Sequence, residues 1–511
     1  MHVRRGLAAA VAVIALSGPV AVAVAAATGV LEWRDDLSPH DRGRVAAVTA
    51  PATGFSAPEP FELKPAGAAT VDKIVNRDIF SHPSGNLSFE QRESFFLGNG
   101  LFRKDWVSSP SSTQASDGLG PLFNARSCQG CHLKDGRGHP PRNAEDDAVS
   151  MLIRLSVPPS SDAERNQLLE RSLAVLAEPT YGTQLQDFAV PGLPAEGKVS
   201  VTYEEIPVAL NGGETVSLRR PTFAITDLGF GPMREDTLIS PRIAQPMIGL
   251  GLLEAVAEAD ILARSDPDDA DGDGISGRPN LVRDVETGEI IPGRFGWKAI
   301  QPTIRAQTAH AFAGDMGLST PVLPVHSGDC TDAQADCLAM PDGAQPALGP
   351  EEVPEDLLDL VVFYSANLGV PERRDVDDPQ VLAGKEQFYA AGCPACHTPK
   401  YVTRRDAERE AHRFQLIWPY TDMLLHDMGE GLADHRPEGD ADGSEWRTQP
   451  LWGIGLTGTV NEEATFLHDG RARTILEAIL WHGGEAQAAR DRVVAMQPAE
   501  RANLIRFLES L

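Results

Sequence analysis

Two copies of one five-residue pattern constrain this chain more than any other feature. They are Cys128-Gln-Gly-Cys131-His132 and, far downstream, Cys393-Pro-Ala-Cys396-His397. Cys-x-x-Cys-His is the attachment signature of c-type haem, because two thiols at this spacing form thioethers to one haem while the histidine ligates its iron from the proximal side. The sequence therefore predicts two covalently bound haem c groups, and the chain must fold around both.

The N-terminus is typical of a secretory signal. Two arginines among the first five residues precede an apolar stretch from Gly6 to about Val24, and small residues up to Ala27 fit a cleavage site. An uncleaved membrane anchor is the alternative, since the run is nearly long enough to span a bilayer. Pro19 in its middle favours cleavage. We expect a signal peptide over residues 1–27 and a periplasmic mature protein without a transmembrane span.

Two other uses of the paired cysteines are weaker. A thioredoxin-like pair does not require the following histidine, and a thiolate zinc site is disfavoured outside the cytoplasm, where thiols oxidise. Cys330 and Cys337 lie in a polar stretch and are expected to form a structural disulfide. A redox-active role for this pair is the alternative.

The charge of the chain narrows its partners. Its 511 residues include 45 Lys and Arg against 73 Asp and Glu, a formal net charge of −28. Nucleic acid is excluded as a natural partner, because binding phosphate needs a basic surface. A basic redox protein would be attracted. The alternative is an acidic surface that only keeps the protein soluble.

The order of predicted elements indicates a mainly α fold with two cytochrome c-like domains. A helix leads into the second motif through Gly384, and the last helix, from about Pro498 to Leu511, has one apolar face. A similar closing helix begins near Asp356. We expect an internal duplication, with the haem 1 domain over residues 28–371, a linker over 372–380 and the haem 2 domain over 381–511.

The first domain is predicted to carry an insertion over roughly residues 180–350. Alternating residues from Lys198 to Ile206 and from Thr215 to Ile225 flank Asn211-Gly-Gly, which predicts a small antiparallel β-sheet. Further on, Asp269, Asp271 and Asp273 match the first half of an EF-hand-type calcium loop. Asn280 stands where that loop would have glutamate, so an unliganded acidic turn remains the alternative.

The second axial ligand of each iron decides whether a haem only carries electrons or can also bind a substrate. For haem 2 the best candidate is His482. It shares a helical face with Ile475 and Ile479, on a helix predicted to start at a capping box, Thr474-Ile-Leu-Glu477, and to end at Gly483-Gly484. The other candidates are His468, His426 and Met428.

Haem 1 has fewer candidates for a second ligand. His139 lies too close to His132 in sequence, and the position of His310 cannot be predicted. We therefore expect haem 1 to be open or weakly ligated.

Three segments carry a family resemblance. They are Gly118-Leu-Gly-Pro-Leu-Phe-Asn-Ala-Arg-Ser-Cys128 running through Gly138, Ser240-Pro-Arg-Ile-Ala-Gln-Pro-Met-Ile-Gly-Leu-Gly-Leu-Leu-Glu254, and Phe466-Leu-His-Asp-Gly-Arg through Glu485. Together they resemble bacterial dihaem oxidoreductases described as peroxidases, which are more remotely similar to bacterial dihaem cytochrome c peroxidases. The resemblance covers nearly the whole mature chain. It implies peroxide reaction at haem 1, electron relay through haem 2, and a distal ligand at His482, where relatives have methionine or tyrosine.

The resemblance also implies roles for two other residues. Glu254 is a candidate acid–base residue by position, although a surface glutamate is the simpler interpretation. Trp297 could carry electrons between the haems or be an ordinary core residue. The implied partners are an electron-donor protein, such as a small cytochrome or cupredoxin, and peroxide or another small oxidant. A dihaem electron carrier without catalysis is the alternative function.

Overall fold

The computed structural model describes residues 30–511, apart from 114–115, 144–145, 147–148 and 346. The predicted signal peptide over residues 1–27 lies outside this part of the chain. Within it, no helix is both long and apolar enough to cross a membrane.

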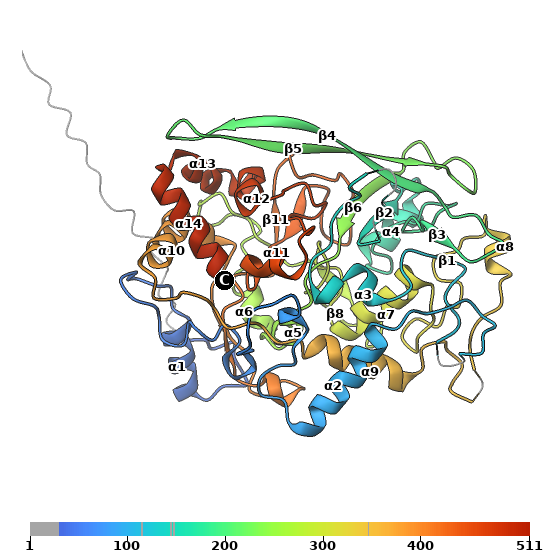
Figure 1. The fold of residues 1–511 in the computed structure, drawn as a ribbon, viewed down its shortest axis with the longest axis horizontal. Coiled ribbons are helices and arrows are strands. Elements are labelled where there is room, and N and C mark those ends of the chain that lie inside the picture. The colour runs from blue at the N-terminus through green and yellow to red at the C-terminus, as the bar shows by residue number, and fades with distance from the viewer. Residues whose placement is uncertain (1–29, 114–115, 144–145, 147–148, 346) are drawn as a thin grey trace, which may run out of the picture.

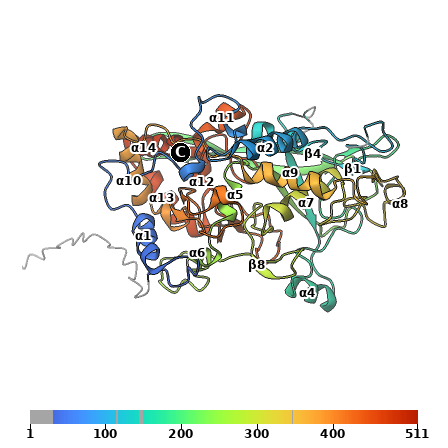
Figure 2. The ribbon, with the colours of Figure 1, turned by 90° about the horizontal axis from the view of Figure 1, so that it is seen from below.

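Two crossed pairs of helices flank the Cys-x-x-Cys-His motifs. The pairs are α2 (Phe89–Phe102) with α9 (Glu355–Ala366), and α10 (Pro379–Ala390) with α14 (Pro498–Ser510). A Cβ atom on Gly98 would lie 2.2 Å from the carbonyl oxygen of Leu360, and one on Gly384 would lie 1.9 Å from that of Asn503. Only glycine therefore permits either crossing, which confirms the predicted role of Gly384. In Figure 2 the α10–α14 pair lies at the left end of the molecule and the α2–α9 pair lies nearer its middle.

The remaining helices are short, and several cover the chain between these pairs. They are α1 (Pro39–Thr49), α3 (Cys128–Cys131), α4 (Asp162–Leu169), α5 (Leu250–Glu254), α6 (Glu258–Leu262), α7 (Ile304–Met316), α8 (Ala335–Leu338), α11 (Thr457–Val460), α12 (Ile475–Trp481) and α13 (Gln487–Ala495). The longest of them is α7. It ends at Gly317, which adopts a left-handed conformation that terminates the helix.

The described chain also contains six two-stranded antiparallel sheets. They pair β1 (Leu122–Phe123) with β3 (Phe188–Ala189), β2 (Met151–Ser156) with β6 (Leu238–Ile243), β4 (Lys198–Ala209) with β5 (Thr215–Thr226), β7 (Leu281–Arg283) with β8 (Ile290–Pro292), β9 (Tyr401–Val402) with β10 (Leu416–Ile417), and β11 (Leu425–Asp427) with β12 (Glu445–Arg447). The fold is thus a mixture of helices and small sheets, in which the predicted helices and insertion sheet are present and five further small sheets are added among the described residues. Short extended segments without a regular alternation of apolar and polar residues carry no clear strand signal.

The β4–β5 hairpin confirms the sheet predicted in the insertion. Lys198 pairs with Thr226 and Ala209 with Thr215, across the turn that contains Asn211. The hairpin arches over α12 and α13 (Figure 1). Its tip is fixed there, because Asn211 donates from its side chain to the carbonyl of Ala495 (2.8 Å). The insertion therefore reaches across to the segment that follows the second haem motif.

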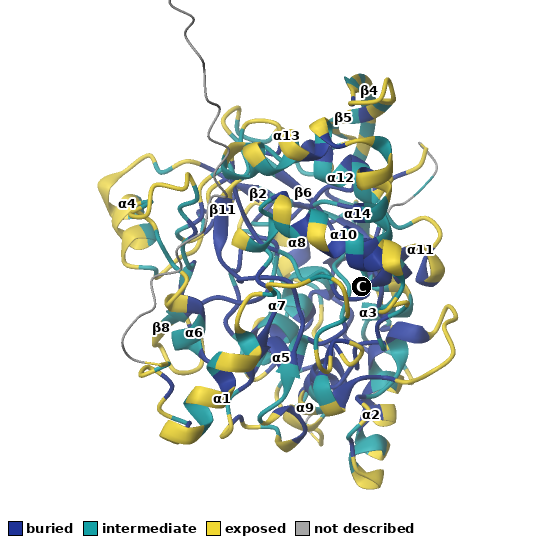
Figure 3. Ribbon diagram, turned by 90° about the vertical axis from the view of Figure 1, so that its left-hand side faces the viewer, coloured by how far each residue is buried: buried dark blue, intermediate teal, exposed yellow. Residues whose placement is uncertain are grey.

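One buried core joins the two predicted domains. Its largest cluster includes Leu358 before the predicted linker and Leu456 after it. Arg373, inside the predicted linker, is buried and bonds Glu62 and the hydroxyl of Ser510. Buried residues fill the centre of the molecule and exposed ones form its rim (Figure 3). The linker is therefore packed, and the division into two domains stays a prediction.

Candidate functional site

His132 is held in the orientation that a proximal haem ligand needs. It follows α3, and its Nδ1 lies 2.7 Å from the backbone carbonyl of Gln245, to which it can donate. Burial lowers the pKa of His132, which favours the neutral imidazole. Nε2 has no hydrogen bond to any described residue and is therefore available to iron. The partner carbonyl belongs to a loop 113 residues away in sequence, which no local pattern could reveal.

The turn after His132 is attached to α9. Tyr364 donates its hydroxyl hydrogen bond to Asp135 (2.7 Å), and Ser81 donates to the other oxygen of the same carboxylate (2.5 Å). Burial raises the pKa of Asp135 to about 6. Phe102, at the end of α2, lies against the His132 ring with centroids 6.3 Å apart. The α2–α9 pair thus supports the first motif directly.

A cavity of about 400 Å³ opens beside this motif. Cys128, Cys131 and His132 all line it. The rest of its lining comes from α7 and from residues that lie far from the motif in sequence. The α7 residues are Gln307, Thr308, His310 and Asp315, and the others include Arg154, Thr183, Arg242, Gln245, Trp297, Arg436 and Glu438. The first motif therefore faces a large space with both apolar and charged walls.

The cavity residues fit a haem group. Haem c needs two thiols, an imidazole and donors for its two propionate carboxylates, and all of these are present. Three buried donor atoms, Arg242 Nη2, Arg436 Nε and Gln245 Nε2, have no hydrogen-bond partner among the described residues, although both guanidinium groups also pair with Glu438. Buried polar groups of this kind are costly unless something satisfies them. Burial lowers the pKa of Arg436 only to about 10, so it stays charged at neutral pH.

His397 is held in the same way in the second motif. It follows a 3₁₀ turn at Cys393–Ala395, and its Nδ1 lies 2.9 Å from the carbonyl of Tyr420. His482 follows α12, with its Nδ1 2.8 Å from the carbonyl of Ala478. Burial lowers the pKa of His397 to about 4, and the nearby charge of His482 contributes. Each imidazole therefore has Nδ1 on a backbone carbonyl, which leaves Nε2 as the nitrogen that could ligate iron.

The helix that carries His482 begins almost as predicted. The hydroxyl of Thr474 accepts from the backbone NH of Glu477 (3.1 Å), which is one half of a capping box. The Glu477 carboxylate instead accepts from the backbone and side chain of Arg473, so the second half is absent. The helix then ends at Trp481, directly before His482.

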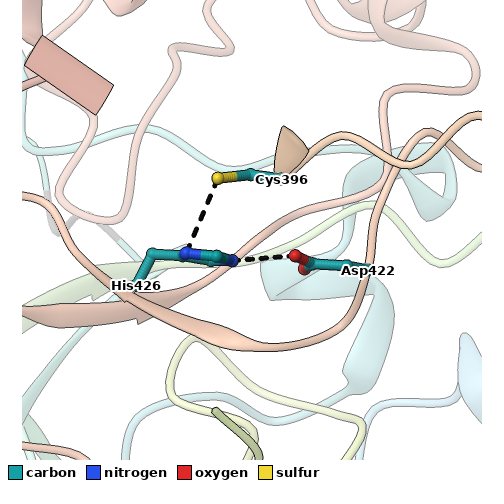
Figure 4. Close-up of side chains that lie close together, drawn as sticks. All are labelled: Cys396, Asp422 and His426. Carbon is teal, nitrogen blue, oxygen red and sulfur yellow. Dashed lines mark hydrogen bonds and ion pairs between the residues drawn. The ribbon is translucent and has the colours of Figure 1, made fainter. Parts of the chain in front are cut away.

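His426 is engaged by two carboxylates and is not free to bind iron. Its Nε2 lies 2.8 Å from Asp422 and its Nδ1 lies 2.6 Å from Glu485. Cys396 Sγ is 3.5 Å from the same Nδ1 (Figure 4). Cys396, Asp422 and His426 could together hold a metal ion. Thioether formation at Cys396 removes the thiolate that such a site would need.

His468 belongs to an aromatic stack. It is buried, and it lies flat on Trp446 with ring centroids 3.7 Å apart. Its edge meets Trp297, which lines the cavity beside His132 and donates from its indole NH to the carbonyl of Ile243 (2.9 Å). The remaining candidate, Met428, packs against the buried apolar cluster that contains Trp297 and Trp446. Trp297 thus combines a packing role with a position on the cavity wall.

Glu254 has a structural position. One carboxylate oxygen accepts from the backbone NH of Ile304 (2.8 Å) at the start of α7, and the other is paired with Arg409 (2.5 Å). Glu254 is not among the residues that line the cavity. The geometry therefore gives its predicted acid–base role no support. His139 is also turned away from the cavity, since Nδ1 lies 2.8 Å from the carbonyl of Pro140 and Nε2 lies 3.4 Å from Glu463.

Sequence reasoning named His310 without placing it and missed Asp315, and both belong to α7. His310 and Asp315 both line the cavity. The available signal was the spacing of Ile304, Thr308, Ala311 and Asp315, which places them on one helical face, but a single acidic residue on such a face does not by itself indicate a site. Burial lowers the pKa of His310 to about 4, and the charge of Arg154 adds to this.

The acidic loop and the disulfide lie away from this cavity wall. Cys330 and Cys337 form the predicted disulfide. In the acidic loop, Asp266, Asp269 and Asp271 bring carboxylate oxygens within 4.8 Å of one another, whereas Asp273 is outside that group. The side chain of Asn280 points into the core and donates to the carbonyl of Lys298 (2.7 Å). Calcium binding at this loop stays a prediction.

Comparison with known proteins identifies one family. A family model described as "di-haem oxidoreductase, putative peroxidase" matches residues 63–511. None of the curated protein sequences is significantly similar to this chain. A solved structure of Kuenenia stuttgartiensis hydrazine synthase is 18% identical with a TM-score of 0.22, over 32% of this chain and 57% of that one. The present chain therefore spans little more than half the length of that neighbour.

Proposed function

The chain belongs to the di-haem oxidoreductase family, and from this premise we propose that it is an exported c-type cytochrome that reduces peroxide at haem 1 and relays electrons through haem 2. The observation that carries the proposal is the difference between the two histidines. His397 is influenced by the charge of His482, and each of these rings has its Nδ1 on a backbone carbonyl. His132 faces a cavity of about 400 Å³, and the other described imidazole on the cavity wall, His310, belongs to α7.

A haem with an exchangeable coordination position can bind and cleave peroxide, whereas one with two protein ligands transfers electrons. The chain supplies the remaining functions at haem 1. Gln245 fixes the orientation of His132 through its carbonyl. Arg242 and Arg436 offer buried donors to the propionates. At haem 2, Tyr420 and Ala478 orient His397 and His482 in the same manner.

Trp297 is proposed to assist electron transfer between the two haems. It lines the haem 1 cavity and contacts His468, which in turn stacks on Trp446. The external electron donor is proposed to be a small cytochrome or cupredoxin with a basic surface, attracted by the net charge of −28. The N-terminal sequence supports a periplasmic location, where such donors and covalent haem attachment both occur.

A non-catalytic dihaem electron carrier is the second candidate, and it differs in one measurable property. Electron paramagnetic resonance of the haem-loaded protein should be recorded in the oxidised and half-reduced states, before and after adding peroxide. We expect one low-spin centre from haem 2 and a high-spin ferric signal from haem 1 that peroxide abolishes. Two low-spin signals that peroxide does not change, in either the oxidised or the half-reduced protein, would refute the peroxidase proposal and favour the electron carrier.

A further inference from the structure

Of the two carboxylates that line the cavity beside His132, Glu438 pairs with Arg242 and Arg436, and Asp315 has no ion pair among the described residues. Asp315 lies on the face of α7 that lines the cavity, in line with Ile304, Thr308 and Ala311. These four residues follow at intervals of three and four, so they occupy one side of the helix. The cavity wall formed by α7 thus ends at a carboxylate, close to the two cysteines that attach haem 1.

The backbone around Asp315 is fixed relative to the first motif. Its carbonyl oxygen accepts from the backbone NH groups of Asn124 (2.9 Å) and Ala125 (3.1 Å), only a few residues before Cys128. Its Oδ1 accepts from the side-chain amide of Gln184 (3.0 Å). Oδ2 has no hydrogen bond to any described residue. One carboxylate oxygen is therefore held in place, and the other is free on the cavity side.

The charges around Asp315 leave it without an ion pair among the described residues. Arg154 of β2 is the charged side chain that acts on it, and His310 of α7, Arg242, Arg436 and Glu438 line the same cavity. Arg154 stabilises the charged carboxylate, but burial outweighs this and raises the pKa of Asp315. A carboxyl group whose pKa is raised keeps its proton to a higher pH than a free one, which suits it to accept a proton and return it. Buried carboxyls without a cation partner are costly and are concentrated at functional sites.

We propose that Asp315 is the acid–base residue of the haem 1 cavity and that Gln184 is the residue that positions it, an inference that rests on the proposed peroxidase function. Asp315 Oδ2 takes a proton from one oxygen of H₂O₂ and returns it to the other. The O–O bond breaks, and the protonated oxygen leaves as water. The remaining oxygen takes up two electrons from the donor protein and two protons and leaves as a second water. The sum is H₂O₂ + 2 e⁻ + 2 H⁺ → 2 H₂O.

The test uses the holoprotein with both haems loaded. Two rates are measured by stopped-flow absorbance across a range of pH: the reaction of ferric haem 1 with H₂O₂, and its association with cyanide. Cyanide is a reporter independent of turnover, because HCN must lose its proton to a nearby base before the anion binds. Asp315→Asn should slow both reactions by roughly 10²-fold or more, the usual range for loss of an acid–base group. It should also remove their acidic pH limb. Asp315→Glu, which keeps a carboxyl group, should restore part of the loss.

The controls separate the possible outcomes. Asp359→Asn, an exposed carboxylate of α9 that pairs with Arg305, should leave both rates at the wild-type level. His310→Gln tests the histidine of α7. The proposal would be overturned if His310→Gln slowed both reactions while Asp315→Asn reacted at the wild-type rate. Haem content and unfolding are measured for each variant, and Asp315→Ser replaces Asp315→Asn if that amide prevents haem loading.

The two levels of the proposal fail differently. A wild-type protein that reacts with neither ligand would refute the peroxidase function itself. A reactive wild type that Asp315→Asn matches in rate and pH profile would refute only the role of Asp315. Gln184→Leu tests whether Gln184 positions Asp315. It removes the hydrogen bond to Asp315 Oδ1 but keeps the carboxyl group, so it should shift the pH profile of cyanide association.

Discussion

Replacing Gly98 by alanine tests how the α2–α9 crossing supports haem 1. The new Cβ would lie 2.2 Å from the carbonyl oxygen of Leu360 and 2.8 Å from Cβ of Tyr364. Neither atom can rotate away, so the two helices must separate by roughly 1 Å to restore ordinary van der Waals contact. Overpacking of this kind costs about 1–3 kcal/mol. A backbone clash belongs at the upper end of that range.

Gly100, on the same helix, provides a matched control. A Cβ atom there would have no other atom within 4 Å. Gly100→Ala should therefore stabilise the protein by about 0.5–1 kcal/mol, because alanine loses less conformational entropy than glycine in a helix. Gly98→Ala makes the same entropic gain, which reduces its net loss to about 2 kcal/mol. The two variants should thus differ by about 3 kcal/mol, although they exchange identical residues two positions apart.

The assay is equilibrium unfolding of the haem-loaded protein in urea, followed by far-ultraviolet circular dichroism and by haem absorbance. Tyr364 bonds Asp135 beside the first motif, and Phe102 lies against His132. Gly98→Ala should therefore also alter the spectrum of haem 1 and leave that of haem 2 unchanged. Equal stability of the two alanine variants would refute the close-crossing argument. A change confined to haem 2 would refute the link between this crossing and His132.

Four further predictions concern other parts of the chain. His482→Ala should convert haem 2 from low spin to high spin in electron paramagnetic resonance, and the same change at exposed His435 should not. Reducing the Cys330–Cys337 disulfide should lower the free energy of unfolding by about 2.5 kcal/mol, as expected for a short loop, and the loss should be absent in the double serine variant. Burial raises the pKa of Glu196 to about 8, so its contribution to stability is complete below pH 4.5 and is lost as pH rises toward 8. Unfolding curves should show a loss of up to about 1.4 kcal/mol per pH unit in that window, which Glu196→Gln should flatten. Calcium titration calorimetry should give a binding isotherm that Asp269→Asn with Asp271→Asn abolishes, and an absence of heat in the wild type would leave only an acidic turn.

Local features of the fold could be predicted from the sequence. The hairpin around Asn211 and the helix that ends before His482 both depend on residues within a few positions of one another. Gly384 was recognisable for a similar reason, since it stands in the helix that leads into the second motif and has an apolar closing helix to pack against. Such signals reflect short-range geometry, which the sequence displays directly.

The composition of the haem 1 cavity could not be predicted in the same way. The carbonyl that orients His132 comes from Gln245, and the acidic end of the wall comes from Asp315 on α7. These contacts join residues far apart in the chain, and no repeating pattern marks them. Glu254 is the reverse case. Its place in a motif suggested an acid–base role, but its carboxylate accepts a hydrogen bond at the start of α7 and pairs with Arg409.

The two attachment motifs alone do not distinguish the two haems. Both histidines place Nδ1 against a backbone carbonyl, Gln245 for His132 and Tyr420 for His397, so their proximal sides are equivalent. Any division of labour must therefore come from the residues beyond each iron. Near His397 the chain provides the imidazole of His482, while near His132 it provides a cavity lined by both His310 and Asp315 of α7. Exchanging the distal residues, and not the motifs, is the change that should exchange the roles of the two haems.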